Sequence, residues 1–184
     1  EPHKSKEIGF NYLVVLELLQ NIFTKISKVL EWRKMDALYI HIPFCMKKCA
    51  YCDFHSFEGK MSESKNYVDY LIKDFKSWPK YTYDTVYFGG GTPSLLEANE
   101  IERILKEIDI SKDAEVTLEL NPATANFEKL QNFRKSGINR LSIGIQSFND
   151  EILKTLGRLH SAEKAKSTYY NARKAGFSNI SLDL

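Results

Sequence analysis

Short apolar runs alternate with amphipathic stretches along the chain from residue 37 onward. The runs are rich in β-branched and aromatic residues and end at proline, glycine or asparagine, which is typical of strands. The stretches between them repeat apolar residues at helical spacing, which predicts helices. Strands are expected near residues 37–42, 84–88, 114–120, 139–145 and 178–184.

Each interval between two predicted strands holds at least one predicted helix. The first helix begins near Ser62 or Ser64, either of which is a suitable N-cap. Two later helices end at glycines that suit the C′ position, Gly137 and Gly176. Four apolar residues share one face of the first helix: Tyr67, Tyr70, Leu71 and Phe75.

The regular alternation of strand and helix predicts an α/β protein with a parallel sheet and helical crossovers. The strands are short and apolar, as expected of buried parallel strands. A doubly wound open sheet and a curved piece of a barrel both fit this pattern. The sequence ends on a strand, so we expect a fragment of a larger fold.

Residues 1–34 differ in character from the rest of the chain. They hold six Lys or Arg and four Asp or Glu, and polar residues interrupt their apolar stretch, so we expect no membrane span. We predict a helical N-terminal extension, residues 1–34, outside a core domain of residues 35–184, with Met35 as a hypothetical natural start. The extension carries an apolar stripe at helical spacing: Leu13, Leu16, Leu19, Ile22 and Ile26.

Composition narrows the class of protein. A chain of 184 residues with 43% hydrophobic residues suits one domain or a large part of one. The net charge of +2 and the lack of a basic block interleaved with aromatic residues predict no nucleic-acid partner. All three cysteines lie close together, which favours a reducing compartment, and we expect a cytoplasmic protein.

The cysteines lie in the stretch CMKKCAYCDF, with C-x₃-C-x₂-C spacing, directly after the first predicted strand. Clustered cysteines are more often metal or redox groups than buried structural thiols. One interpretation is a zinc site in which His41 or His55 is the fourth ligand. Another is an iron–sulfur cluster with one iron left open to an exogenous ligand. The residues alone leave both interpretations open.

Longer motifs carry a resemblance to a known family. LYIHIPFCMKKCAYCDFHS, VYFGGGTPSLL, LELNP, GINRLSIGIQSFNDEILKTLGR and ISLDL occur in the order and spacing of one group. That group is the radical S-adenosylmethionine (SAM) superfamily, in particular the oxygen-independent coproporphyrinogen III oxidases and their sister branch, the HemW haem chaperones. The resemblance covers residues 36–184. It implies the N-terminal part of a partial (βα)₆ TIM-like barrel, truncated after about the fifth strand.

The resemblance also implies the cofactors. Cys45, Cys49 and Cys52 would hold a [4Fe–4S] cluster, and SAM would chelate the fourth iron. The cluster would then deliver an electron that breaks the sulfonium carbon–sulfur bond, giving methionine and a 5′-deoxyadenosyl radical. An electron donor such as flavodoxin or ferredoxin is implied as a partner.

Further residues match family positions at the SAM site. Tyr51 matches the aromatic that flanks the adenine, Glu119 an acid that contacts SAM, and Arg158 suits a carboxylate. The GGGTP loop looks like the contact for the SAM amino group, with glycine N–H groups free to reach a ligand. For each residue the alternative is an ordinary packing or surface role. The full set is Tyr39, Tyr51, Gly90, Gly91, Thr92, Glu119, Gln146, Arg158 and Asp183.

One departure distinguishes the two branches. The oxidases carry a Cys-Gly-Cys ending, whereas this chain has Cys52, Asp53 and Phe54. The resemblance therefore favours the HemW branch, with haem or porphyrin as partner and haem as a further ligand. The alternatives are an oxidase that converts coproporphyrinogen III to protoporphyrinogen IX, and a zinc-binding structural module. We assign no catalytic residue and expect the fragment to be inactive alone.

Overall fold

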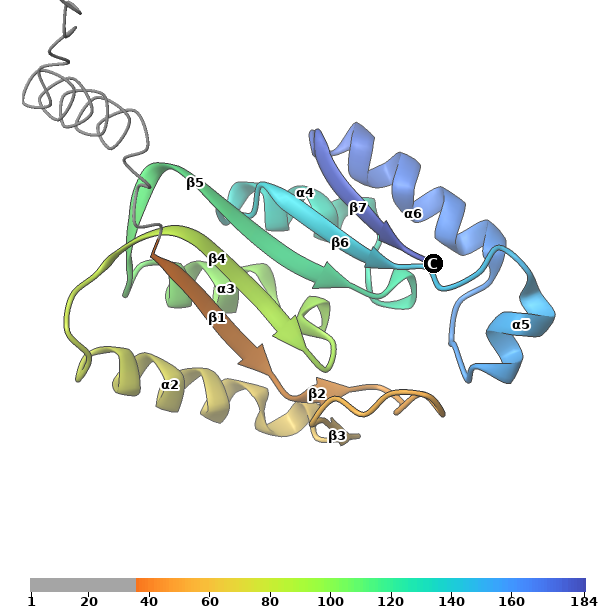
Figure 1. The fold of residues 1–184 in the computed structure, drawn as a ribbon, viewed down its shortest axis with the longest axis horizontal. Helices are drawn as coiled ribbons and strands as arrows, with labels where there is room; N and C mark the ends of the chain where they lie inside the picture. The colour runs from red at the N-terminus through yellow and green to blue at the C-terminus, as the bar shows by residue number, and fades with distance from the viewer. Residues whose placement is uncertain (1–35) are drawn as a thin grey trace, which may run out of the picture. The chain divides into compact units, whose positions relative to one another are not determined.

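The computed structural model describes residues 36–184, so the predicted helix within residues 1–34 lies outside the described part. A five-stranded sheet runs through it in the order β1-β4-β5-β6-β7, and every neighbouring pair is parallel (Figure 1). The prediction of a parallel α/β sheet is therefore confirmed. The strands are β1 (Ala37–Ile42), β4 (Thr82–Gly90), β5 (Asp109–Leu120), β6 (Arg140–Gly144) and β7 (Asn179–Asp183).

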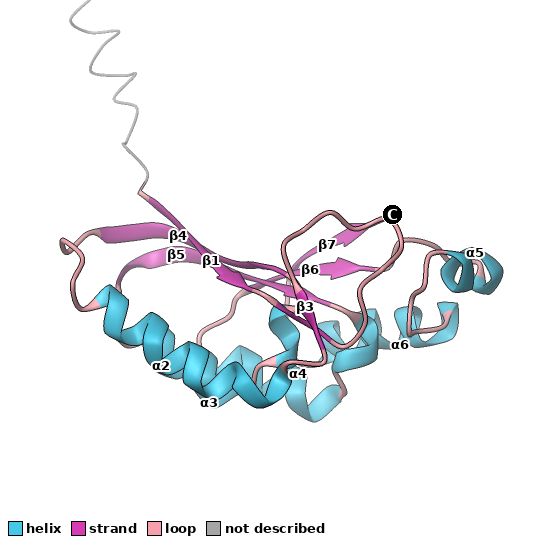
Figure 2. Ribbon diagram, turned by 90° about the horizontal axis from the view of Figure 1, so that it is seen from below, coloured by secondary structure: helices cyan, strands magenta, loops and turns pink. Residues whose placement is uncertain are grey.

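The main helices lie on one side of this sheet (Figure 2). A second, two-residue parallel pair follows β1, formed by β2 (Phe44–Cys45) and β3 (Phe57–Glu58). This pair was not predicted from the sequence, because two residues are too few for a periodic pattern. The helices are α2 (Ser64–Phe75), α3 (Ala98–Leu105), α4 (Phe127–Lys135), α5 (Asp150–Thr155) and α6 (Ala162–Lys174), with single 3₁₀ turns at Met61–Glu63, Pro93–Leu95 and Pro122–Thr124.

The strand order decides between the two architectures that the sequence left open. Each strand of the large sheet is added next to the one before it, and the order never reverses. A doubly wound sheet reverses its order at a switch point and so has helices on both faces. Successive crossovers of one hand in one direction put all helices on the same face, as in a barrel wall. The described residues are therefore part of a TIM-like barrel.

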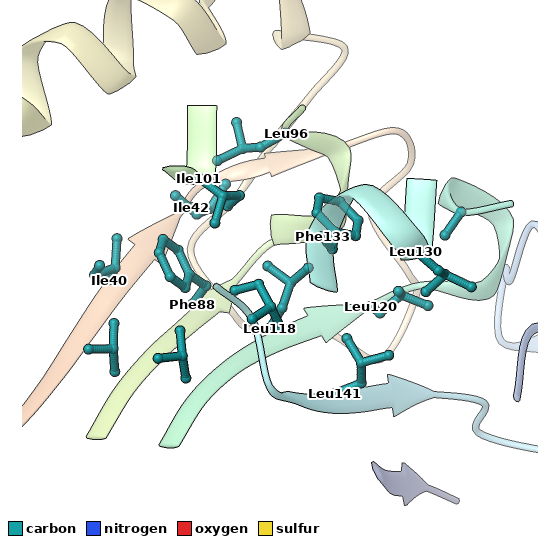
Figure 3. Packing of buried hydrophobic residues seen from close by; sticks show 14 of the residues in the cluster. Ile40, Ile42, Phe88, Leu96, Ile101, Leu118, Leu120, Leu130, Phe133 and Leu141 are labelled. Carbon is teal, nitrogen blue, oxygen red and sulfur yellow. The ribbon is translucent and has the colours of Figure 1, made fainter. Parts of the chain in front are cut away.

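The strands alternate between two different faces. Ile40, Phe88, Leu118 and Leu141 point toward the helices and are buried in one continuous core (Figure 3). The neighbouring positions carry mostly polar side chains on the helix-free face. The expectation of strands that are simply apolar was wrong in this respect, because only one face is covered by helices. The polar face is where the candidate site lies.

Local capping follows the sequence at several helix ends. The Asn149 side chain accepts hydrogen bonds from the first turn of α5, and Ser161 caps α6 in the same way. Gly137 and Gly176 have φ values of +110° and +96°, the left-handed conformation expected of a C′ residue. These two predicted helix ends are confirmed.

Two expectations about α2 were wrong. Tyr70 is 72% exposed, and Val68 is the buried residue in that turn. The N-cap is Glu63, and neither Ser62 nor Ser64 caps the helix, because a 3₁₀ turn runs directly into it. In the described part of the chain, no helix combines the length and apolar character needed to cross a membrane.

Replacing Phe133 tests the core between α4 and the sheet. Phe133 is fully buried, and Phe133→Ala should lower the free energy of unfolding by about 3–5 kcal/mol, since it leaves a cavity among rigid neighbours. Chemical denaturation followed by circular dichroism measures the change. Tyr70→Ala is the control and should cost less than about 0.5 kcal/mol. Equal effects of the two variants would show that the assignment of buried and exposed faces is mistaken.

Candidate functional site

A cavity of about 210 Å³ lies at the carboxyl end of the sheet. It is enclosed by the cysteine loop after β2, the ends of β4, β5, β6 and β7, and the turn between α5 and α6. A larger hollow, about 310 Å³, lies at the opposite end of the strands and has none of the predicted site residues. The predicted residues that line the first cavity are Tyr51, Cys52, Gly90, Gly91, Thr92, Glu119, Gln146, Arg158 and Asp183.

The glycines at the end of β4 make room for the strand that leads into the cysteine loop. A Cβ on Gly91 would lie 2.7 Å from the carbonyl oxygen of Phe44, and a Cβ on Gly90 would lie 2.5 Å from the His41 ring. Gly90 also has a φ of +112°, which side chains disfavour. The two glycines are therefore needed for close packing of β1 and β2 against β4.

The N–H groups of the two glycines, which the sequence suggested could reach a ligand, have acceptors within the chain. The N–H of Gly91 donates to the Ile42 carbonyl at 2.8 Å, and that of Gly90 donates to a Glu119 carboxylate oxygen at 3.1 Å. Both donors are therefore used within the chain. A ligand amine, which itself donates hydrogen bonds, needs acceptors, and Glu119 is the acceptor beside this loop.

The three thiols are free, and they differ in burial: Cys45 is buried, while Cys49 and Cys52 are partly exposed. The Cys45 carbonyl accepts from the Gly59 N–H at 3.2 Å, and the Cys52 N–H donates to the Cys49 carbonyl at 3.1 Å. These bonds fix the loop at both ends. The Thr92 hydroxyl lies 3.6 Å from the Cys45 sulfur, so the glycine loop also touches the first thiol.

The loop suits a cluster better than a single metal ion. No group of three or more His, Cys, Asp or Glu side chains within residues 36–184 is arranged around one point as a metal ion requires. A [4Fe–4S] cluster takes one thiolate per iron, so its ligands do not converge on a single atom. The candidate zinc ligand His41 is held elsewhere, with its Nε2 atom 2.8 Å from the carbonyl oxygen of His55. The donor set of three thiols fits the cluster.

Glu119 is the acidic group of the cavity. The Tyr87 hydroxyl donates to one carboxylate oxygen at 2.9 Å, and the Gly90 N–H donates to the other. Burial raises the pKa of Glu119 above its usual 4.5, although these two donors act in the opposite direction. Burial and the adjacent Glu119 carboxylate together raise the pKa of Tyr87 to about 12, so the tyrosine stays a donor.

Tyr39 lies beside the cavity rather than in its lining. Its ring stacks on Tyr87 with centroids 6.0 Å apart, and its hydroxyl is 3.4 Å from the His41 Nδ1 atom. The side chain is 52% exposed on the helix-free face, so it is not packed in the core. Tyr39 is thus connected to Glu119 through the Tyr87 ring and hydroxyl.

The far wall of the cavity is formed by the ends of β6 and β7. The Ser142 hydroxyl is 3.2 Å from an Asp183 carboxylate oxygen, and the Gln146 N–H donates to the Asp183 carbonyl at 2.7 Å. Gln146 has a φ of +69°, a left-handed conformation that is uncommon for a residue other than glycine. This conformation turns the chain back over the strand end, where its side chain reaches the cavity.

Arg158 joins two parts of the site. One terminal guanidinium nitrogen, Nη2, donates to the Gly144 carbonyl at 2.6 Å, and the other, Nη1, lies 3.6 Å from the Cys49 sulfur. Burial raises the pKa of the neighbouring Tyr51 hydroxyl, while the Arg158 cation acts in the opposite direction. Arg158 is therefore a half-buried contact between the end of strand β6 and the cysteine loop, and the alternative of a solvated surface charge is wrong.

Sequence reasoning missed three polar residues at the site: Tyr87, Ser142 and Asn121. Tyr87 bonds the site carboxylate, and the other two line the cavity. Ser142 interrupts an apolar strand, and Tyr87 precedes the glycines by two positions, on the same face of the strand as Gly89. The register of the strands places Tyr87 and Ser142 next to Glu119. This register cannot be read from the sequence motifs.

Comparisons with known proteins agree with this geometry. The model of the radical SAM superfamily matches residues 39–184. The Escherichia coli coproporphyrinogen III oxidase HemN, described as a radical SAM enzyme, has a similar structure, with a TM-score of 0.74 and 26% identity. That similarity covers 88% of this chain and 40% of the oxidase chain.

Two curated relatives are called heme chaperone HemW. The protein from Buchnera aphidicola subsp. Schizaphis graminum is 40% identical over 157 residues, and that from Haemophilus influenzae is 41% identical over 161 residues. In each case the match covers 80% of this chain and 42% of the relative, so the chain spans less than half the length of either protein. Members of the superfamily in general use a [4Fe–4S] cluster and SAM. On the evidence of the matching family model, the HemN-like fold and these relatives, the chain belongs to the radical SAM superfamily.

Proposed function

We propose that this chain holds a [4Fe–4S] cluster through Cys45, Cys49 and Cys52 and binds SAM in the adjoining cavity. We further propose that the complete protein binds and delivers haem, as the name of its HemW relatives indicates. The observation that carries the proposal is the common location of the cysteine loop and the polar strand ends. Both border one cavity at the carboxyl end of the sheet, the edge at which ligands of such folds bind.

The residues of the chain have distinct tasks in this proposal. The cluster, held by Cys45, Cys49 and Cys52, would supply the electron that reduces the sulfonium of SAM. Glu119 accepts a hydrogen bond from the SAM amine, and its own donor, Tyr87, keeps the carboxylate oriented. Tyr51 offers an aromatic surface to the adenine. Gln146 offers its side-chain amide to the ribose or to the carboxylate of the ligand, and Asp183 offers an acceptor to the ribose hydroxyls.

The identity of the residue after Asp53 favours haem delivery over porphyrinogen oxidation. Phe54 lines the cavity at the position where the oxidase branch carries a second cysteine of the Cys-Gly-Cys ending. A phenyl ring neither ligates metal nor transfers a proton. The structural similarity to the oxidase is consistent with a shared fold and a shared cofactor site, while the 40–41% identity to the HemW proteins favours their branch.

Cysteine replacement tests the cluster. Anaerobic reconstitution of the wild type should give about four irons per chain and the broad visible absorption of an iron–sulfur centre. Cys45→Ala, Cys49→Ala and Cys52→Ala should each lose most of that absorption, because each thiolate holds a different iron. His55→Ala should keep it. A protein that takes up one equivalent of zinc and refuses iron would overturn the proposal.

The raised pKa of Glu119 gives SAM binding a dependence on pH. The amine donor favours the ionised carboxylate, so the wild-type affinity should fall as the pH drops through the raised Glu119 pKa, above the usual 4.5. At neutral pH, Glu119→Gln should bind SAM about tenfold to hundredfold more weakly, as expected for loss of a charged hydrogen bond.

Equilibrium dialysis of labelled SAM against the cluster-loaded protein measures both effects. The ratio of the wild-type affinity to the Glu119→Gln affinity should shrink as the solution is acidified, since protonation removes the advantage of the carboxylate. Glu115→Gln changes a carboxyl four residues earlier on β5, away from the cavity lining, and is the matched control. A ratio that stays constant across the titration would exclude Glu119 as the ligand acceptor.

The two branches differ in the reaction that the complete protein performs. With a reductant and SAM under anaerobic conditions, we expect no conversion of coproporphyrinogen III to protoporphyrinogen IX, because Phe54 replaces the second cysteine. Haem titration should instead show saturable binding with a shifted Soret band. Product formation by the wild type, measured by fluorescence after oxidation, would assign the protein to the oxidase branch.

A further inference from the structure

The turn between α5 and α6, residues 157–160, packs directly against the cysteine loop. A Cβ on Gly157 would lie 4.0 Å from the Cys49 Cα atom and 3.9 Å from the Ala50 nitrogen. Gly157 has a φ of +75°, so the chain bends sharply there and presents the next residue, Arg158, toward the loop. The contact joins segments more than 100 residues apart in the chain.

Both ends of this turn are anchored. The Arg158 N–H donates to the Leu153 carbonyl at 2.9 Å, which ties the turn to α5. His160 is 6% exposed, and its Nε2 atom is 3.1 Å from the Ile145 carbonyl oxygen at the end of β6. Burial and the Arg158 cation lower the pKa of His160 below its usual 6.5, so this imidazole is neutral at pH 7. Arg158 therefore provides the positive charge of the turn on a fixed backbone.

The Arg158 guanidinium spans the gap between the end of β6 and the cysteine loop. It contacts the Gly144 carbonyl on one side and the Cys49 sulfur on the other. Gly144 is suited to this contact, since a Cβ there would lie 3.4 Å from the Arg158 Nη2 atom. The Nε atom of Arg158 is buried and has no hydrogen-bond partner in the described part of the chain. The position of the Arg158 guanidinium is therefore set by contacts with neighbouring protein atoms rather than by solvent.

We propose that Arg158 is a positioning residue that fixes the cysteine loop before the cluster binds and raises the reduction potential of the bound cluster. The proposal rests on the proposed [4Fe–4S] site and adds a role to the SAM contact predicted for this residue. The effect on the potential is electrostatic. The reduced cluster carries one more negative charge than the oxidised cluster, so a cation beside one thiolate favours the reduced form.

An arginine-to-lysine variant distinguishes the positioning of the cysteine loop from the effect of the positive charge on the potential. The planar fork of Arg158 reaches two acceptors at once, whereas an ammonium is a point charge on a flexible stem. Arg158→Lys should therefore keep the electrostatic effect and lose the link between Gly144 and Cys49. Arg158→Gln should lose both. Arg173→Gln removes the same charge on α6, where the side chain donates to the nearby Ser178 carbonyl at 2.7 Å, and is the matched control.

The first measurement is hydrogen exchange in the cluster-free protein without SAM. Amides of residues 45–54 should exchange about tenfold faster in Arg158→Gln and Arg158→Lys than in the wild type, the factor expected for loss of one charge-assisted hydrogen bond. Amides of β4 and β5 should be unchanged in all variants, which shows that the sheet remains folded. Arg173→Gln should match the wild type throughout.

The second measurement is the midpoint potential of the reconstituted cluster, again without SAM, so that any contact with SAM plays no part. It should shift to more negative values in Arg158→Gln and stay close to the wild type in Arg158→Lys and Arg173→Gln. The proposal is overturned if either the exchange or the potential of Arg158→Gln equals that of the wild type. If the wild type itself takes up no cluster, the proposed function fails, while the exchange experiment still tests the link.

Discussion

The site depends on two glycines at the end of β4, Gly90 and Gly91, where no side chain could be accommodated. The Gly91 Cα atom lies so close to the Phe44 carbonyl that a Cβ would overlap it, and Gly90 leaves the same kind of space for His41. Because of this, β1 can run beside β4 to its end and continue into the cysteine loop. The Gly90 N–H then meets the Glu119 carboxylate from the next strand. Close strand packing thus sets both the position of the thiols and the orientation of the acid.

The site also depends on the sheet having two chemically different faces. Residues such as Phe88 and Leu118 face the helices, and their burial supplies the apolar area that stabilises the fold. The intervening residues, Tyr87 and Glu119 among them, face the other way and bond to one another. The Glu119 carboxylate can be partly buried on this face because hydrogen-bond donors to both of its oxygens offset the loss of hydration. The polar site therefore does not interrupt the core.

Much of this was predictable from the sequence. The periodic runs located all five strands of the large sheet, because packing against helices imposes a pattern on every strand. The order of the strands was not predictable, since it depends on the direction of each crossover. Motifs identified Glu119 and Arg158, but not the partners Tyr87 and Ser142, which are set by strand register. Tyr70 was misplaced because helical spacing gives a face and not its exact limits.

The residue at position 54 connects the geometry with the branch of the family. Phe54 is 59% exposed, yet it lines the same cavity as Glu119 and Arg158, so the cavity has an apolar residue at its open side. A cysteine at this place would add a nucleophile and a redox-active group next to Cys52. A phenyl ring adds only a surface for packing, and a planar macrocycle such as haem is bound largely by such surfaces. A phenylalanine in place of that cysteine changes the chemistry at the mouth of the cavity and leaves Cys45, Cys49 and Cys52 in place.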